Sequence, residues 1–272
     1  MSNPFAFHFM VNAFRAGTIV AVAAGVMGWF MVLRRQTFAG HTLGVVGFPG
    51  AAGATLLGVS TTWGFLAFCS GAALVIAALP RIGRGNLSEE TAGIGVVQAF
   101  ALACGALFVS LYHGNLNAVT DLLFGTFLGI TDGQVVVLLI AAVVGVGLLV
   151  GLGRPLLFAS IDADVAAARG VPVRALSMAF LLLLGLAAAE ASQITGSLLV
   201  FALLVMPAAT AQLITARPGR SLLLTVGLAL GVTWLGMTVA FYSDYPIGFF
   251  VTTFAFAAYT VAALGRRLAA TA

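Results

Sequence analysis

The chain has 272 residues, of which 61% are hydrophobic and 7% charged. A soluble domain carries roughly a quarter of charged residues, so this composition excludes an ordinary soluble protein and most classes of enzyme. The formal net charge of +4 comes from 12 basic and 8 acidic residues, and every basic residue is an arginine. A nucleotide-binding P-loop needs a lysine, so the chain by itself cannot be an ordinary P-loop ATPase.

The apolar runs predict an all-α fold, a polytopic transmembrane helix bundle. Each crossing of a bilayer takes about 20 apolar residues, so the length allows roughly eight to ten helices and no sizeable soluble domain. The first run has no small-residue cleavage site before it, and we expect it to be retained as a helix and not removed as a signal peptide. We predict about nine spans, at 15–33, 41–59, 63–80, 91–111, 133–152, 175–190, 195–215, 221–241 and 247–264.

The arginines divide the connections between these helices into two kinds. Eleven of the 12 fall on every second connection, at 34–35, 81–84, 154–174, 217–220 and 266–267. The alternate connections carry none. Because cytoplasmic loops are enriched in Lys and Arg, the arginine side is predicted to be cytoplasmic, with the C-terminus inside and the N-terminus outside. Arginines sorted by membrane side form no basic patch, so we expect no nucleic-acid partner.

One external connection has a different character. Residues 115–131 contain an apolar stretch that is too short to cross a bilayer, and Asp121 lies within it. Irregular backbone is tolerated at membrane depth only where protein or a water-filled cavity satisfies it. We predict a re-entrant or interfacial segment here.

The long arginine-side connection, residues 153–174, reads GRPLLFASIDADVAAARGVPVR. Asp162 and Asp164 precede a run of small residues with good helix propensity, and Gly170 and Pro172 then provide a stop signal. This pattern predicts a short helix on the cytoplasmic face. It is either a helical linker or a surface against which another protein docks, because so short a helix is not stable alone.

Four segments resemble the metal-type ABC importer permeases, the membrane subunits of zinc, manganese and iron uptake systems. Residues 161–170, IDADVAAARG, are similar to that family's FD-x-E-x-A-x-x-x-G coupling segment. Residues 196–211, GSLLVFALLVMPAATA, resemble its G-x-LLV-x-ALLV-x-PAATA helix. Residues 121–131 resemble its LLFGSLLGVS stretch, and 245–248 its external turn ending in P-x-G.

The resemblance implies a single permease domain over residues 1–272, with the coupling loop at 153–174 inside it. A separate cytoplasmic ABC ATPase would dock on this loop and hydrolyse the ATP, so the chain itself is not expected to be an enzyme. The coupling residues that match the family motif are Asp162, Asp164, Ala166 and Gly170.

The resemblance also implies a prokaryotic cell-membrane location, a second permease copy in a homodimer or heterodimer, and an external metal-binding protein that delivers the ion. The expected cargo is a divalent transition-metal ion, and no cofactor is expected to be bound covalently. Zinc is favoured because imidazole is a borderline-soft ligand, with manganese and iron as alternatives.

The family's metal motif is incomplete in this chain. After the first arginine pair, the family pattern R-x-x-x-x-x-G-D-A-L-S-H places an acidic or histidine ligand and a histidine four residues apart, on one face of a helix. Here His41 takes the first position but Val45 takes the second, and a valine cannot bind metal. His41 is therefore either a metal-binding residue of the pathway or a structural histidine that hydrogen-bonds a neighbour.

Three further residues are candidates for the substrate pathway. His113 and Asp121 lie in an external connection, where they either meet an arriving cation or are simply solvated. Glu190, near the outer end of a helix, either lines the path or sits at the membrane interface.

Three other functions compete with a metal importer. An intramembrane enzyme lacks support, because the chain has neither an HExxH nor a GxSxG motif. A secondary transporter should show paired intramembrane acids for ion coupling, and only Glu190 comes close. A permease of the same family with an altered substrate would be indicated by Val45.

Overall fold

In the computed structural model, the described residues are 7–79, 87–112, 122–125, 130–197, 200–243 and 245–271. Within these ranges the regular secondary structure is entirely helical. The helices are α1 (His8–Leu33), α2 (Thr37–Leu56), α3 (Thr61–Ala78), α4 (Leu87–Leu111), α6 (Asp132–Ile161), α7 (Ala163–Ala168), α8 (Val173–Thr195), α9 (Val200–Ile214), α10 (Pro218–Phe241) and α11 (Ile247–Thr271).

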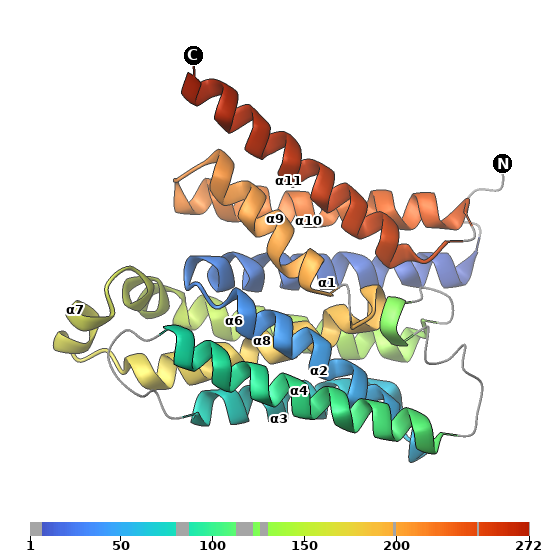
Figure 1. The fold of residues 1–272 in the computed structure, drawn as a ribbon. Coiled ribbons are helices and arrows are strands. Elements are labelled where there is room, and N and C mark those ends of the chain that lie inside the picture. Colours follow the sequence, from blue (N-terminus) through green and yellow to red (C-terminus); the bar gives the residue numbers. More distant parts are fainter. Residues whose placement is uncertain are drawn as a thin grey trace.

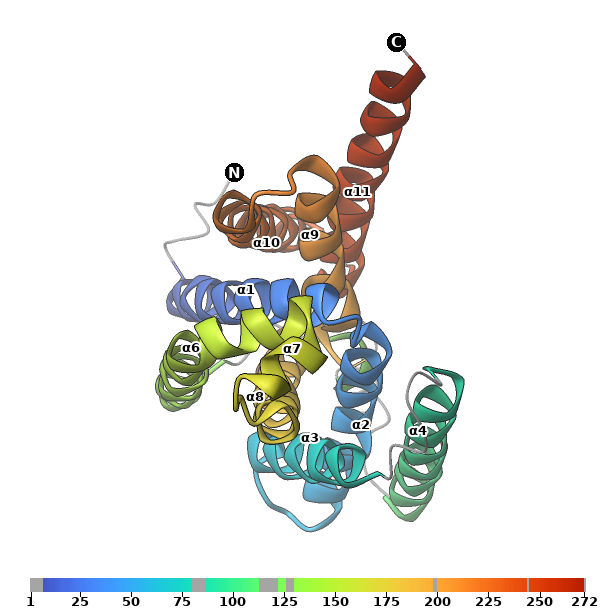
Figure 2. The same cartoon turned by 90° about the vertical axis from the view of Figure 1, so that its left-hand side faces the viewer.

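The long helices run back and forth along one common direction, and the short α7 lies at one end of the bundle (Figure 1). Two helices form its centre, since α1 contacts α6, α8, α9 and α10, and α8 contacts α2, α3 and α6 as well. Figure 2 shows α2, α3 and α4 on one side of this centre and α9, α10 and α11 on the other. The all-α membrane bundle predicted from the apolar runs is confirmed.

Seven of the described helices are long and apolar enough to cross a bilayer: α1, α3, α4, α6, α8, α10 and α11. The other two helices predicted as spans are α2 and α9. At 15 residues, α9 is about 22 Å long, shorter than a bilayer core of about 30 Å. Both α2 and α9 contain a proline, Pro49 and Pro207 respectively. Helix α9 is shorter than the seven, whereas α2, with 20 residues, differs from them in composition and not in length. Both lie against the two central helices.

Helix α6 is longer than predicted. It continues to Ile161, nine residues beyond the predicted end at 152, although it contains Pro155. A proline inside a helix removes one backbone hydrogen bond, but Arg154 places this turn at the arginine-bearing end, where water can solvate the freed carbonyl. The region between α6 and α8 is therefore mostly helical, and only a few residues on either side of α7 are irregular.

Two glycines allow a close crossing near the break between α8 and α9. Gly125 has φ of 78° and Gly196 has φ of 77°, and a Cβ on Gly196 would overlap the carbonyl oxygen of Leu123. The Ser197 N–H donates a hydrogen bond of 3.2 Å to the Leu122 carbonyl. Residues 122–125 are thus held against the break. Most of the predicted re-entrant segment, 115–131, lies outside the described residues.

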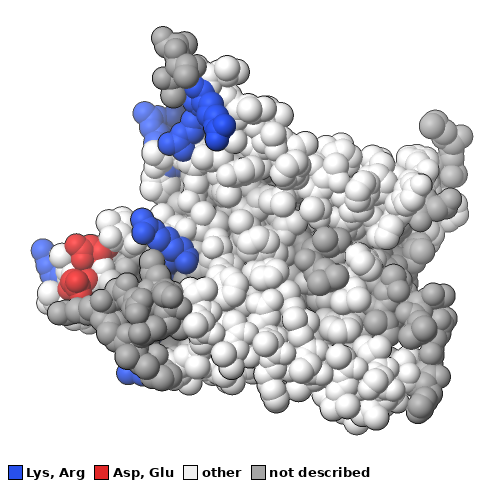
Figure 3. Space-filling view, viewed as in Figure 1, with Lys and Arg blue, Asp and Glu red and all other residues white. Residues whose placement is uncertain are grey.

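The described arginines gather at the end of the molecule that carries α7 (Figure 3). They lie at the ends or starts of α1, α6, α7, α8, α10 and α11, and Arg15, within α1, is the exception. Asp162 and Asp164 are the acidic residues with described side chains at this end. The start of α1 and the end of α11 lie at opposite ends of the bundle (Figure 1), as an odd number of crossings requires.

Candidate functional site

His41 lies near the start of α2 and points toward α9. Its ring packs edge-on against Phe201, with ring centroids 5.0 Å apart and an interplanar angle of 78°. Its Nδ1 atom is buried and has no hydrogen-bond partner among the described residues. The described surroundings therefore do not supply the hydrogen bond to Nδ1 that a purely structural histidine would make.

The residue one turn further along α2 is apolar and enclosed. Val45 is 4% exposed. Between the two, a Cβ on Gly44 would overlap Cγ1 of Val200, so the first turn of α9 rests directly on α2 at this level. The second ligand position of the family motif is consequently filled by the packed side chain of Val45. On this face of α2, His41 therefore has no second metal ligand one turn further along.

Glu190 is in the interior of the bundle and not at its surface. It is 1% exposed, and its Oε2 atom has no hydrogen-bond partner among the described residues. An ionisable side chain buried without a partner in a membrane helix is costly, and it generally marks a substrate or ion pathway. Of the two interpretations of Glu190 from sequence, burial favours the pathway over the membrane interface.

Helix α2 connects the His41 region with the Glu190 helix. A Cβ on Gly47 would lie 3.1 Å from the Oγ atom of Ser192, two residues after Glu190 in α8. The same helix meets α9 at His41 and Gly44. The tertiary structure therefore places His41 and Glu190 on two helices that pack against each other.

Ser197 is a candidate that the sequence did not single out. It follows Gly196 at the break between α8 and α9, is 1% exposed, and its Oγ atom has no partner among the described residues. Its carbonyl oxygen lies 3.7 Å from the position of a Cβ on Gly44. The sequence signal was slight, because serine is common in membrane helices; only its position after a glycine at a helix break sets it apart.

These three residues supply one nitrogen and two oxygen donors of the kinds that bind divalent transition metals. Within the described part of the chain, no group of three or more His, Cys, Asp or Glu side chains lies close enough together to hold a metal ion. Such sparse donors fit an ion in transit better than a closed structural site, because conduction requires weak binding. His113 and Asp121 lie outside the described residues.

Helix α7 begins with a side-chain cap. Oδ1 of Asp162 accepts hydrogen bonds from the backbone N–H groups of Asp164, at 3.1 Å, and Val165, at 2.9 Å. Ile161 and Val165 expose 75% and 45% of their surface at this end of the molecule. The cap orients a short helix whose outer surface combines apolar side chains with the two carboxylates of Asp162 and Asp164.

The C-terminal end of α7 is closed by a glycine. Gly170 has φ of 81°, its N–H donates to the Ala167 carbonyl, and the Val171 N–H donates to the Ala166 carbonyl, both at 3.0 Å. This pair of bonds is the Schellman motif, in which glycine adopts the left-handed conformation. Ala166 is fully buried and fixes the inner side of α7 to the bundle.

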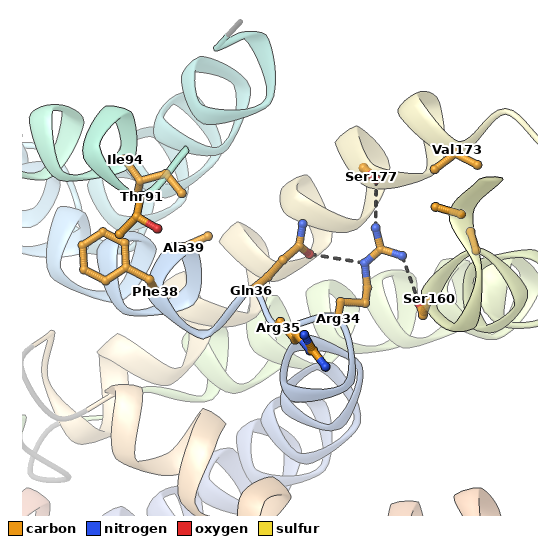
Figure 4. A pocket seen from close by; sticks show the side chains of 12 residues that line it. Arg34, Arg35, Gln36, Phe38, Ala39, Thr91, Ile94, Ser160, Val173 and Ser177 are labelled. Atoms are coloured by element: carbon orange, nitrogen blue, oxygen red, sulfur yellow. Dashed lines mark hydrogen bonds between the residues drawn. The ribbon is translucent and has the colours of Figure 1, made fainter. Parts of the chain in front are cut away.

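Arg34 joins the end of α1 to both helices that flank α7 (Figure 4). Its Nη1 donates to Oγ of Ser160 at 3.0 Å, its Nη2 to Oγ of Ser177 at 2.8 Å and its Nε to Oε1 of Gln36 at 3.3 Å. Its guanidinium lies 5.3 Å from the ring centroid of Phe180. Because Ser160 is in α6 and Ser177 is in α8, this side chain ties the two ends of the α7 connection to α1.

Comparison with known proteins gives concordant matches over nearly the whole chain. Residues 6–266 match the model of the ABC 3 transport family. The chain is 32% identical over 253 residues to the chelated iron transport system membrane protein YfeC of Yersinia pestis, covering 92% of this chain and 84% of that protein. It is 30% identical over 247 residues to the manganese import system permease protein ScaB of Streptococcus gordonii, covering 89% and 86%.

A solved structure gives the same match in three dimensions. The fold superimposes with a TM-score of 0.82 on a chain of PsaBC from Streptococcus pneumoniae in complex with Fab. The sequence identity is 25%, and the match covers 94% of this chain and 91% of that chain.

Proposed function

The chain belongs to the ABC 3 transport family, and from that premise we propose that it carries a divalent transition-metal ion across the cell membrane in an ATP-driven importer. The chain is a multi-pass membrane permease and a transport subunit. Its lack of lysine agrees with ATP hydrolysis on a separate chain. The observation that carries the metal cargo is a pair of buried side-chain atoms without a described partner, Nδ1 of the partly buried His41 and Oε2 of the buried Glu190, on adjacent helices.

The proposed path runs along α2, between the end opposite the arginines and the arginine-bearing end. An external metal-binding protein delivers the ion at the first end, away from the described arginines other than Arg15. Glu190 and Ser197 then provide oxygen donors and His41 a nitrogen donor. The sparse donors allow release on the cytoplasmic side, because no closed cage has to be opened.

Coupling to ATP hydrolysis is proposed to pass through α7. The ATPase docks on the exposed surface formed by Ile161, Asp162, Asp164 and Val165. Helix α7 is joined to α6 through Asp162 and to α8 through residues 169–172. A displacement of α7 therefore moves α8, which carries Glu190, relative to α2, which carries His41.

A second permease copy is proposed to cover the face between α9 and α11. An apolar groove there is lined by Phe124, Met206, Phe249 and Phe256 among others, and the helical turn at 122–124 reaches it through Phe124. The backbone is irregular at Gly125 and at the break between α8 and α9, and irregular backbone at membrane depth is tolerated where protein covers it and not where it faces lipid. A second copy of the permease would give that cover, while lipid contacts the other outer helices.

The choice of metal is the finer part of the proposal. A single imidazole at position 41 favours zinc, whereas the relatives described above are named for manganese and for chelated iron. We therefore propose a divalent transition metal, and the transport test compares zinc, manganese and iron directly.

The test is uptake of radioactive metal into proteoliposomes that contain this chain, its ATPase and its binding protein. We expect ATP-dependent uptake of at least one of the three metals, and a large loss with His41→Ala. The matched control is His8→Ala, since the His8 side chain is 75% exposed at the opposite end of the bundle. Full uptake by His41→Ala would assign His41 a structural role only.

The same assay separates the alternatives. Uptake that persists without the ATPase and follows a proton or sodium gradient would identify a secondary transporter. An assembled complex that hydrolyses ATP but moves none of the three metals would mean that Val45 marks a changed substrate.

A further inference from the structure

The turn between α1 and α2 holds an arginine where the backbone favours glycine. Arg35 has φ of 57°, its N–H donates to the Val32 carbonyl at 3.1 Å, and the Gln36 N–H donates to the Met31 carbonyl at 3.0 Å. These bonds form a Schellman motif with Arg35 in the left-handed position. Among the described non-glycine residues, Arg35 is the one with a positive φ.

Two other helices end in the same motif, and both use glycine. Gly58 closes α2 with φ of 69°, and Gly170 closes α7 with φ of 81°. A side chain with a Cβ is strained in this region, whereas glycine is not. Strained non-glycine residues persist mainly where the side chain serves a purpose, so the guanidinium of Arg35 requires an explanation that the turn itself does not supply.

The guanidinium of Arg35 has no protein partner in the described structure. The residue is exposed and makes no hydrogen bond or ion pair with the described residues. The side chain is therefore not held in place as a structural bridge, in contrast to Arg34, which is fixed by Ser160 and Ser177. A cation on a strained turn, without a partner among the described residues, is available to bind a ligand.

A cavity of about 300 Å³ lies beside this turn, with Arg34 and Arg35 in its wall (Figure 4). Hydroxyl groups of Thr91, Ser160 and Ser177 also line it, and its described lining contains no carboxylate. Ala163, the first residue of α7, forms part of the same wall. The cavity thus combines two guanidinium groups with neutral hydrogen-bonding groups, a composition suited to an anion.

We propose that this cavity binds a phosphate group, with Arg35 as the principal contact and Arg34 as the fixed cationic wall. Guanidinium matches phosphate oxygens with two parallel hydrogen bonds and is always charged. The cavity lies at the arginine-bearing end, level with the ends of several membrane helices, so the phosphate comes either from the headgroup of an anionic phospholipid or from a soluble phosphate compound.

Binding there would connect three parts of the transport machinery. The turn leads into α2 and His41, Ser160 and Ser177 belong to the helices on either side of α7, and Ala163 begins α7 itself. An occupied cavity would add a phosphate contact between these elements to the hydrogen bonds that Arg34 already makes with Ser160, Ser177 and Gln36. The site does not depend on which metal is carried.

The test uses Arg35→Gly in the full-length chain. Glycine removes the guanidinium but suits the left-handed turn, so this variant is expected to fold with an unfolding temperature no lower than that of the wild type. The matched control is Arg220→Gln, which removes one exposed positive charge from the first turns of α10 at the same end of the molecule and lies outside the cavity.

Purified protein in neutral detergent is titrated with dioctanoyl phosphatidylglycerol, with dioctanoyl phosphatidylcholine and with inorganic pyrophosphate, and the thermal unfolding midpoint is followed. We expect phosphatidylglycerol to stabilise the wild type more than phosphatidylcholine does. Arg35→Gly should bind it about fivefold more weakly, and Arg220→Gln should bind it as the wild type does. Stabilisation by pyrophosphate alone would assign a soluble phosphate ligand to the same site.

Three results would overturn the proposal. The first is a wild type that neither phosphatidylglycerol nor pyrophosphate stabilises, and the second is an Arg35→Gly variant that keeps the wild-type affinity. The third is an equal loss of phosphatidylglycerol affinity in Arg220→Gln, which would show that the effect comes from the general positive charge of this end and not from the cavity.

Discussion

At the scale of single residues, the clearest feature is a carboxylate inside an apolar bundle. Glu190 is 1% exposed, and one of its oxygens has no partner among the described residues. Its burial is not needed for packing, because an uncharged side chain of the same size would be less costly there. A requirement for the charge itself would explain its presence.

We therefore expect Glu190→Gln to lower metal uptake at least about tenfold while leaving the thermal stability of the purified protein unchanged or higher. Glutamine keeps the shape and removes the charge. Uptake into proteoliposomes and thermal unfolding in detergent measure the two effects, with Asp132→Asn, an exposed acid, as the control. Normal uptake by Glu190→Gln would remove this residue from the path.

Position 45 gives a complementary prediction. Val45 lies one helical turn from His41 on the same face of α2, so Val45→His restores the second ligand that the family motif contains. We expect zinc binding to become about tenfold tighter or more and metal release to become slower, because two imidazoles can hold one ion. Binding titration and uptake rates measure this, with Val45→Leu as a control for the change in side-chain size. Unchanged zinc affinity would show that the site does not lie on this face of α2.

Sequence reasoning identified His41 and Glu190 because polar residues within apolar runs are conspicuous in one dimension. It missed Ser197, because serine is common in membrane helices. It also missed the role proposed for Arg35, because the residue type alone does not predict that this arginine adopts the left-handed conformation. Both became visible only through their surroundings, a helix break in one case and a Schellman motif in the other.

At the scale of elements, the short helix α7 combines three devices, of which the sequence already suggested the acidic start and the glycine stop. Asp162 caps its first turn, Ala166 anchors it and Gly170 ends it. A six-residue helix has too few internal hydrogen bonds to persist alone, so each device contributes to its orientation. Loss of the Asp162 cap should therefore disturb the orientation of α7, and with it the proposed ATPase contact, before it affects the rest of the bundle.

Two substitutions at Asp162 separate capping from charge. Asp162→Ala removes the cap, at a cost of about 1 kcal/mol, and we expect lower ATP hydrolysis and uptake in the reconstituted complex. Asp162→Asn keeps an oxygen that accepts the same backbone hydrogen bonds, and we expect it to retain most of both activities. If asparagine were as harmful as alanine, the negative charge would contact the ATPase directly.

The elements also show where local patterns mislead. The span predicted at 133–152 ended before Gly153 and Pro155, yet α6 continues to Ile161. Its last turns are held by tertiary contacts, including the hydrogen bond from Arg34 to Ser160, which no reading of the local sequence could include. The ends of α3, α10 and α11 that face away from the arginines were predicted within a few residues, because turn residues and polar groups mark them directly.

At the scale of the whole molecule, the distribution of arginine predicts how the chain sits in the membrane. The described arginines, with the exception of Arg15, lie at the end that carries α7 (Figure 3). From the positive-inside rule we predict that this end lies in the cytoplasm, where an ATPase could reach α7. The same prediction has the opposite end, with the start of α1, facing the external binding protein.

Cysteine labelling tests this orientation. In a Cys69→Ala, Cys104→Ala background, Ser60→Cys should react with a membrane-impermeant maleimide in intact cells, because residue 60 lies in an exposed connection at the end away from the arginines. Gly219→Cys, at the start of α10, should react only after the membrane is permeabilised. The reverse pattern would invert the predicted topology.

The sequence by itself determined the properties that depend on composition and local order: a helical membrane protein without its own ATPase, arginines on alternate connections, and a capped short helix at the arginine end. These follow from apolar length, charge and the backbone preferences of aspartate, glycine and proline, which act over a few residues. Only the tertiary structure decided that the first turn of α9 rests on α2 at His41, that Glu190 is enclosed, and that Arg34 joins α1 to Ser177, which is 143 residues away along the chain. Such contacts arise from the packing of distant helices, and packing is a property of several surfaces at once that no single stretch of sequence contains.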